Sequence, residues 1–193
     1  MTNLYQQLYD THQQLQQAKP LVLNLTNYVT QDFMANILLA LGCAPIMSES
    51  SEELVELTTI AHSLNLNIGT LNAEFTHRAT DAGKLMQQQN KCVVLDPVGA
   101  GATRSRTRLA QELLPLANII RGNASEIMAL NSSSFSSYGV ESSIESLSAM
   151  LSAQNIVKQT QKTIVVSGKI DLIYAPHANY QNKFGIELMT KVT

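Results

Sequence analysis

The residues best placed for chemistry lie in the loop Asp-Pro-Val-Gly-Ala-Gly-Ala-Thr, which begins at Asp96 directly after the apolar run 92–95. A carboxylate at the end of a strand can hold Mg²⁺, directly or through water. The glycines let the backbone approach a ligand and can leave N–H groups free to face phosphate. The loop is equally typical of a turn that Asp-Pro begins and the glycines only shape. The local sequence leaves both interpretations open.

A second polar group is Arg-Gly-Asn-Ala-Ser-Glu, which runs from Arg121 to Glu126. Asn123 and Glu126 have the spacing of a capping box, so helix initiation alone can explain them. The functional interpretation gives Glu126 a share in Mg²⁺ binding and gives Arg121 a phosphate to pair with. One residue can do both, because a helix start at a strand end is already an anion site.

Weaker candidates are Ser167 and Met47. The Ser167 hydroxyl either belongs to a turn or touches a nucleotide phosphate. Met47 either lines an apolar ligand pocket or is ordinary core. Two phosphate motifs are excluded: the loop after Asp96 lacks the third glycine of a dinucleotide fingerprint, and Gly168-Lys169 lacks the Ser or Thr of a Walker loop. The role of Lys169 stays open.

The elements that must position these residues follow from apolar runs and capping signals. Strands are predicted at 21–25, 44–47, 64–68, 92–95, 118–120, 163–166 and 170–174, with a further strand in the tail at 188–192. Helices are predicted at 3–18, 30–41, 51–60, 72–89, up to about 114, from 123, and at 144–161, with Thr30, Ser51 and Asn72 as caps and a Ser-rich surface loop at 132–148.

Alternating helices and strands, several of them continuously apolar, predict a mostly parallel sheet buried between helix layers. Ligands bind such sheets at the carboxyl ends of the strands. Asn27, Met47, Asp96, Arg121 and Ser167 all follow or end predicted strands, so we expect them at one edge of the sheet.

Composition narrows the class of protein. The chain has 193 residues, which suits one domain over 1–193, with 45% hydrophobic and 15% charged residues and a net charge of −2. Nothing in this balance favours nucleic acid or an anionic membrane. No signal peptide and no membrane-spanning run is predicted, and a reducing cytoplasm fits. Cys43 and Cys92 are predicted to be small buried hydrophobes.

Several segments in order resemble hydroxyethylthiazole kinase. They are Asn24-Leu-Thr-Asn27, Leu39-Ala-Leu-Gly-Cys-Ala-Pro-Ile-Met47, Leu66-Asn-Ile-Gly-Thr-Leu71, Leu95-Asp-Pro-Val-Gly-Ala-Gly-Ala102, Ile120-Arg-Gly-Asn-Ala-Ser-Glu126 and Val166-Ser-Gly168 with Asp171. The resemblance implies a three-layer αβα ribokinase-like fold. It also implies transfer of the ATP γ-phosphoryl group to the hydroxyl of 4-methyl-5-(2-hydroxyethyl)thiazole in thiamine biosynthesis or salvage, with Mg²⁺ and a homotrimer.

The resemblance also implies roles for individual residues. Met47 and Asn27 would contact the thiazole alcohol. Arg121 and Ser167 would contact ATP. Asp96 and Glu126 would organise Mg²⁺ and the phosphates, which agrees with the positioning and charge neutralisation that phosphoryl transfer needs.

The departure from the family lies at the end of the chain. In the family, a segment resembling 188–193 runs into a Gly-Ala-Gly-Cys-type catalytic loop, whose cysteine would lie beyond Thr193 here. The resemblance therefore implies an incomplete domain without a catalytic residue, and little kinase activity. Two alternatives are a non-catalytic remnant that binds thiazole or pairs with kinase subunits, and a kinase for a pyrimidine or pyridoxal, against which Asn27 and Met47 argue.

Overall fold

Eight strands form one sheet in the part of the chain that the structure, a computed structural model, describes: residues 3–131 and 142–184. The order across the sheet is β2-β1-β3-β4-β5-β6-β7-β8. The strands are β1 (Leu21–Leu25), β2 (Ala44–Met47), β3 (Ser63–Asn67), β4 (Cys92–Asp96), β5 (Ile119–Asn123), β6 (Thr163–Ser167), β7 (Asp171–Ala175) and β8 (Ala178–Asn182). Strands β1 to β6 pair in parallel, and β7 and β8 add an antiparallel edge.

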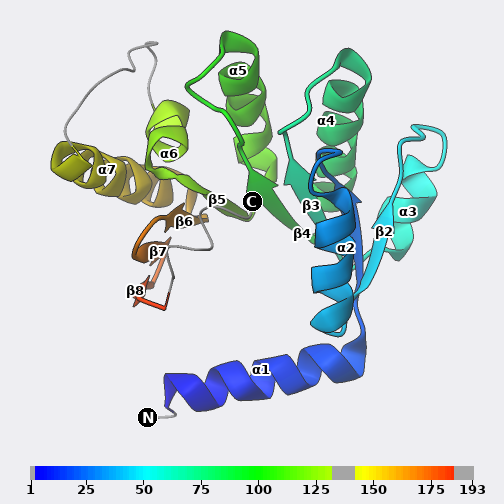
Figure 1. The fold of residues 1–193 in the computed structure, drawn as a ribbon. Helices are drawn as coiled ribbons and strands as arrows, with labels where there is room; N and C mark the ends of the chain where they lie inside the picture. The colour runs from blue at the N-terminus through cyan, green and yellow to red at the C-terminus, as the bar shows by residue number, and fades with distance from the viewer. Residues whose placement is uncertain (1–2, 132–141, 185–193) are drawn as a thin grey trace.

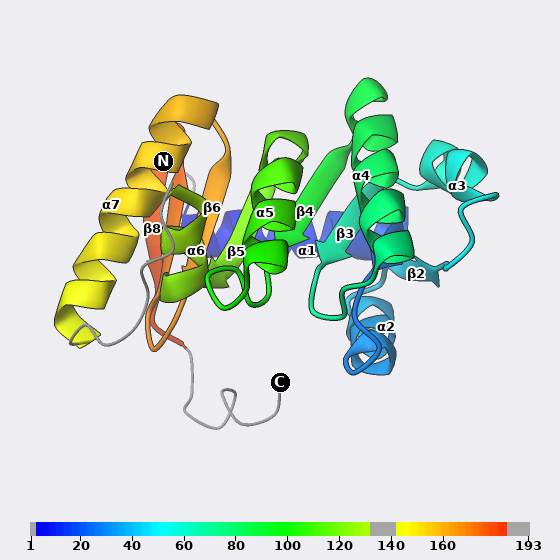
Figure 2. The same cartoon turned by 90° about the horizontal axis from the view of Figure 1, so that it is seen from above.

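Helices cover the two sides of this sheet unequally. They are α1 (Leu4–Ala18), α2 (Gln31–Ala40), α3 (Leu54–Ile60), α4 (Ala73–Gln88), α5 (Arg104–Leu113), α6 (Ala124–Asn131) and α7 (Ser142–Thr160), with a 3₁₀ turn at Leu114–Leu116. Helices α3 to α7 lie along one face, whereas α1 lies on the opposite side (Figures 1 and 2). This is the predicted three-layer αβα fold with a mostly parallel sheet.

The core lies between the sheet and helices α3 to α7. Each central strand sends alternate apolar side chains to that face, as the two-residue period of a strand requires. Helix α4 packs against this face with a stripe of apolar side chains at helical spacing. Side chains with no more than 4% exposure in this layer include Leu23, Leu64, Leu66, Val93, Leu95, Ile120 and Ile164 from the sheet and Phe75, Ala79, Ala82 and Met86 from α4.

The opposite face of the sheet is only partly covered by described residues. On β4, Val93 and Leu95 are fully buried, whereas Cys92 is exposed and Val94 is intermediate. Strand β6 alternates in the same way. The prediction that continuously apolar strands are buried on both faces is therefore wrong for these two strands. Burial is confirmed for Cys43 and wrong for Cys92, because Cys92 faces the side of the sheet that described residues cover only in part.

Most predicted element boundaries agree within a few residues, and the exceptions have local causes. Asn72 caps α4, with its Oδ1 accepting from the Phe75 N–H at 2.7 Å. Thr30 occupies the cap position of α2 but makes no capping hydrogen bond. Ser51 is wrong as a cap, since α3 begins three residues later with Glu53 before it. Strand β8 was not predicted, and the tail strand at 188–192 lies outside the described residues.

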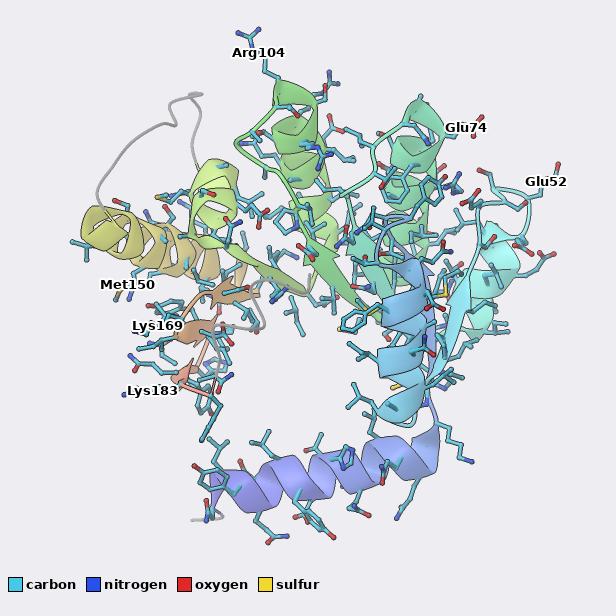
Figure 3. All side chains as sticks on the ribbon, in the orientation of Figure 1. Glu52, Glu74, Arg104, Met150, Lys169 and Lys183 are labelled. Atoms are coloured by element: carbon cyan, nitrogen blue, oxygen red, sulfur yellow. The ribbon has the colours of Figure 1, made fainter. Side chains whose placement is uncertain are left out.

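The apolar side chains of helix α1 are largely exposed. None of its residues is buried, and Leu4, Tyr5, Leu8 and Tyr9 are each at least 46% exposed. Near its carboxyl end, the Gln16 backbone packs against Gly42 after α2. Figure 3 shows the side chains of α1 standing apart from those of the sheet. Among the described helices, none is long and apolar enough to cross a membrane.

Candidate functional site

The carboxyl ends of the parallel strands bring the predicted site residues to one edge of the sheet. Met47, Asp96 and Ser167 are the last residues of β2, β4 and β6. Arg121 lies inside β5, which runs three residues further than predicted. Glu126 lies in the first turn of α6, which directly follows β5. The expectation that these residues share one edge is confirmed.

A chain of amide hydrogen bonds crosses this edge from β1 to β4. The Asn27 Nδ2 group donates to Asn67 Oδ1 at 2.9 Å, and the Asn67 Nδ2 group donates to Asp96 Oδ2 at 2.9 Å. Asn27 is itself held by the Val29 and Thr30 N–H groups, both at 3.0 Å from its Oδ1. The orientation of the Asp96 carboxylate is thus fixed through Asn67, which the sequence analysis did not select.

Asp96 keeps its proton to a higher pH than an ordinary aspartate. The pKa of Asp96 is raised from 3.8 to about 6, mainly by burial and then by the nearby charge of Glu126, against the lowering effects of Arg121 and of the Asn67 hydrogen bond. Among the described residues, no hydrogen bond reaches Asp96 Oδ1. The site therefore holds a buried negative charge that its protein neighbours do not fully compensate.

Glu126 ties the loop after β4 to the start of α6. Its Oε2 accepts from the Asn123 N–H at 2.9 Å, while Asn123 Oδ1 accepts from the Glu126 N–H at 2.9 Å. This is the predicted capping box. The second oxygen, Oε1, accepts from the Gly99 N–H at 2.9 Å. The residue is 9% exposed, so its carboxylate acts as a buried brace between two segments of the edge.

The N–H groups of the glycine loop are already occupied. Besides the Gly99 N–H, the Ala100 N–H donates to Pro97 O at 2.9 Å and the Ala102 N–H donates to Gly99 O at 3.0 Å. The Gly101 N–H donates to Thr107 Oγ1 at 2.8 Å. The functional interpretation of free N–H groups facing phosphate is therefore wrong for residues 99–102. The turn interpretation holds, because acceptors in the loop itself and on α5 and α6 satisfy these donors.

We expect Gly99→Ala to destabilise the chain by about 1–2 kcal/mol. Gly99 has φ +77, and an added Cβ would lie 2.8 Å from the Arg106 side chain, which holds Val98 O and Gly69 O through its two terminal nitrogens. Urea unfolding measures the change. The matched control is Gly168→Ala, where the nearest atom to an added Cβ is 3.6 Å away. Equal losses in both variants would contradict the expectation.

Arg121 and Ser167 lie on the partly covered face of neighbouring strands. In the register of β5 and β6, Arg121 is opposite Val165 and Asn123 is opposite Ser167, so Arg121 and Ser167 share one face. Arg121 is exposed, and its charge acts on Asp96. The Ser167 hydroxyl donates to Gly122 O at 3.3 Å. A cation thus lies near Asp96, and a hydroxyl lies one strand further along the same face, where a phosphate chain could bind.

A small pocket opens at the ends of β1 and β2. Met47 lines this pocket, together with Asn24, Leu25, Thr26, Tyr28, Gln31, Ser48, Glu49, Thr70, Phe75 and Arg78. Asn27 adjoins the pocket in sequence but directs its amide to Asn67 instead. Arg78 and Thr26 were missed by the sequence analysis. A charged residue inside the apolar stripe of α4 was the available signal for Arg78.

The site fits a metal that is held mainly by phosphate and water. The residues described by the structure contain no group of three or more His, Cys, Asp or Glu side chains able to hold a metal ion. Asp96 offers one carboxylate oxygen without a hydrogen bond from these residues, whereas each oxygen of Glu126 already accepts a backbone N–H. Mg²⁺ characteristically uses one or two carboxylates plus substrate phosphates and water, so this donor set suits it.

Sequence comparisons point to one group of proteins. A model of the "Hydroxyethylthiazole kinase family" matches residues 12–193. The chain is 42% identical over 190 residues to hydroxyethylthiazole kinase of Aliivibrio salmonicida, covering 97% of this chain and 72% of that protein. It is 38% identical over 192 residues to the protein of the same name in Chlamydia caviae, covering 98% of this chain and 73% of that protein.

Structural comparisons agree. The fold superposes on a hydroxyethylthiazole kinase protein of Pyrococcus horikoshii with a TM-score of 0.85 at 32% identity, covering 95% of this chain and 69% of that one. It is also similar to the pyridoxal kinase of Staphylococcus aureus, with a TM-score of 0.63 at 15% identity over 84% of this chain and 70% of that one. The second likeness concerns the fold alone.

Proposed function

The chain belongs to the hydroxyethylthiazole kinase family, and on this premise we propose that it acts in the transfer of the ATP γ-phosphoryl group to the hydroxyl of 4-methyl-5-(2-hydroxyethyl)thiazole. The observation that carries the proposal is that one edge of the sheet holds both a pocket lined by Met47 and, on β4 and β5, a buried carboxylate and a cation. Met47 suits contact with a small ring, and Asp96 and Arg121 suit a phosphate chain.

We assign the alcohol substrate to the Met47 pocket. Met47 gives the ring a soft apolar wall, and the hydrogen-bonded Asn27 keeps the loop between β1 and α2 in place. The amide chain through Asn67 then fixes Asp96 relative to that loop. Phosphoryl transfer depends on such positioning, since the protein contributes little covalent chemistry.

We assign the phosphates of ATP to Arg121 and Ser167, and Mg²⁺ to Asp96 with support from Glu126. Arg121 offers a fork of N–H donors that matches phosphate oxygens. Ser167 offers a hydroxyl on the same face of the sheet. Bound Mg²⁺ would supply neutralisation of the phosphate charge. Glu126 keeps the loop at Gly99 and the start of α6 together, so that Asp96 and Arg121 stay at a fixed separation.

Isothermal titration of the chain with the thiazole alcohol, with Mg²⁺ and ATP, and with pyridoxal tests the proposal, alongside an ATP-consumption assay. The proposal expects binding of the thiazole alcohol and of ATP, and no comparable binding of pyridoxal. Absence of binding by both the thiazole alcohol and ATP would overturn it. The expectation of little or no kinase activity stays a prediction, which the same ATP assay checks.

We expect Met47→Ala to weaken binding of the thiazole alcohol about tenfold, because the ring loses apolar contact surface. Affinity for ATP should change little. The matched control is Met150→Ala, since Met150 lies on α7 at the other end of the sheet from β2 (Figure 3). An unchanged thiazole affinity in Met47→Ala would remove Met47 from the proposed substrate site.

The proposal includes a homotrimer in the cytoplasm. Large apolar side chains on α2 and the turn before it are accessible: Tyr28 is 55% exposed, Val29 90% and Phe33 52%. Such a surface is typical of an interface between subunits. Analytical ultracentrifugation should give three times the chain mass of 21.1 kDa, and Phe33→Glu should lower that mass. A monomer in the unaltered chain would contradict this part.

A further inference from the structure

Arg78 is a buried cation without an anionic partner in the pocket beside Met47. It is 6% exposed, and its Nε is shielded from solvent without a hydrogen bond. Among residues 3–131 and 142–184, its guanidinium makes no hydrogen bond and no ion pair. Its Cζ lies 6.0 Å from the centroid of the Phe75 ring. A face-on aromatic contact offsets only part of the cost of burying a charge.

Thr26 adds a second unpartnered polar group to the same lining. Its Oγ1 is shielded from solvent and has no hydrogen-bond partner. Buried polar groups are satisfied in nearly all native structures, so each exception requires an explanation. Two exceptions in one pocket, one of them a permanent cation, point to a ligand that carries acceptor atoms and a negative charge.

We propose that Arg78 and Thr26 form a carboxylate-binding subsite in this pocket. The guanidinium fork matches a planar carboxylate with two parallel hydrogen bonds, and the threonine hydroxyl can donate a third. Charge balance favours a monoanion over a phosphate dianion. Glu49, which is exposed, lines the same pocket, so a dianion would face a like charge after the single positive charge of Arg78 is used.

The subsite narrows the class of substrate. Met47 and Phe75 provide apolar walls for a ring, and the subsite adds a binding contact for a carboxylate on that ring. A heteroaromatic alcohol that also bears a carboxylate should therefore bind this pocket more tightly than the uncharged thiazole alcohol. This last assignment rests on the proposed function, whereas the carboxylate subsite itself does not.

Isothermal titration of the full chain with thiazole-5-carboxylate, its carboxamide and inorganic phosphate tests the subsite. We expect the carboxylate to bind at least about tenfold more tightly than the carboxamide, since charge-assisted hydrogen bonds are roughly twice as strong as neutral ones. Arg78→Met should abolish this preference, and Thr26→Val should reduce it about threefold. The control Arg108→Met removes an exposed arginine of α5 and should keep the preference.

Equal affinities for carboxylate and carboxamide in the unaltered chain, or a preference for phosphate, would overturn the subsite. So would an unchanged preference in Arg78→Met with a melting temperature like that of the unaltered chain. Thr26→Val gives the answer where Arg78→Met fails to fold. If the chain prefers the carboxylate but binds neither the uncharged thiazole alcohol nor ATP, the proposed function is contradicted. The carboxylate subsite is still supported in that case.

Discussion

Asp96→Asn is expected to lower phosphoryl transfer by at least about a hundredfold. The substitution keeps the size of the side chain and its acceptor for the Asn67 amide, but it removes the negative charge that we assign to Mg²⁺. Affinity for ATP in the presence of Mg²⁺ should fall with it, which titration calorimetry measures even where turnover is slow. The matched control is Asp81→Asn, an exposed carboxylate on α4 that should leave both quantities unchanged.

The same variant is expected to be more stable than the unaltered chain at neutral pH in the presence of EDTA. The pKa of Asp96 is raised from 3.8 to about 6 by burial first and by Glu126 second. The folded chain therefore binds the proton more tightly than the unfolded chain, and stability falls as pH rises from about 4 to about 6. The loss amounts to about 3 kcal/mol above that window.

Urea unfolding at pH 4 and pH 7.5 checks this expectation. The two chains should differ little at pH 4, where Asp96 is mostly protonated in the folded state. They should differ by up to about 3 kcal/mol at pH 7.5, with Asp96→Asn the more stable. A variant that is less stable at pH 7.5 would show that the carboxylate is compensated by its neighbours. If Asp96→Asn loses ATP binding but gains stability, the Asp96 carboxylate serves ligand binding and does not stabilise the fold.

Glu126→Gln is expected to lower the free energy of unfolding by about 2 kcal/mol. Each carboxylate oxygen accepts one backbone N–H, from Gly99 and from Asn123, both at 2.9 Å. Glutamine offers a single acceptor oxygen, so its NH₂ group would face one of these donors. The loop after β4 or the start of α6 would then be released, and phosphoryl transfer should fall at least about tenfold.

Hydrogen exchange over residues 97–103, combined with urea unfolding, measures this loss. The matched control is Glu112→Gln, because Glu112 is a partly exposed carboxylate whose recorded partner is Arg108 at 2.8 Å. That control should stay within about 0.5 kcal/mol of the unaltered chain. Equal stability of the two variants, with unchanged exchange in the loop, would mean that Glu126 does not brace the edge.

The local elements followed from the sequence because their causes are local. The run Leu21–Leu25 is apolar and bounded by Pro20 and Thr26-Asn27, and it is β1 as predicted. Asn72 was selected as a cap, and it accepts the hydrogen bond that a cap accepts. The capping box of Asn123 and Glu126 depends on three residues of separation, so the sequence alone could reveal it.

The second partner of Glu126 could not be found in this way. Gly99 lies 27 residues earlier in the chain, and the two meet because β4 and β5 are neighbours in the sheet. The same pairing explains why the Gly99 N–H is not free to face a phosphate. The glycines suggested an open phosphate-binding loop, yet its N–H groups find acceptors partly on α5 and α6.

The exposure of Cys92 also depends on the tertiary structure. The apolar run 92–95 predicted burial, but a strand is buried on both faces only where helices cover both. The sequence by itself therefore determined the fold class, most of its elements and the residues at the strand ends. Only the tertiary structure decided the Asn27–Asn67–Asp96 chain, the brace at Glu126 and the unpartnered Arg78. These depend on strand order and register, which bring together side chains that are far apart in sequence and that no local preference can pair.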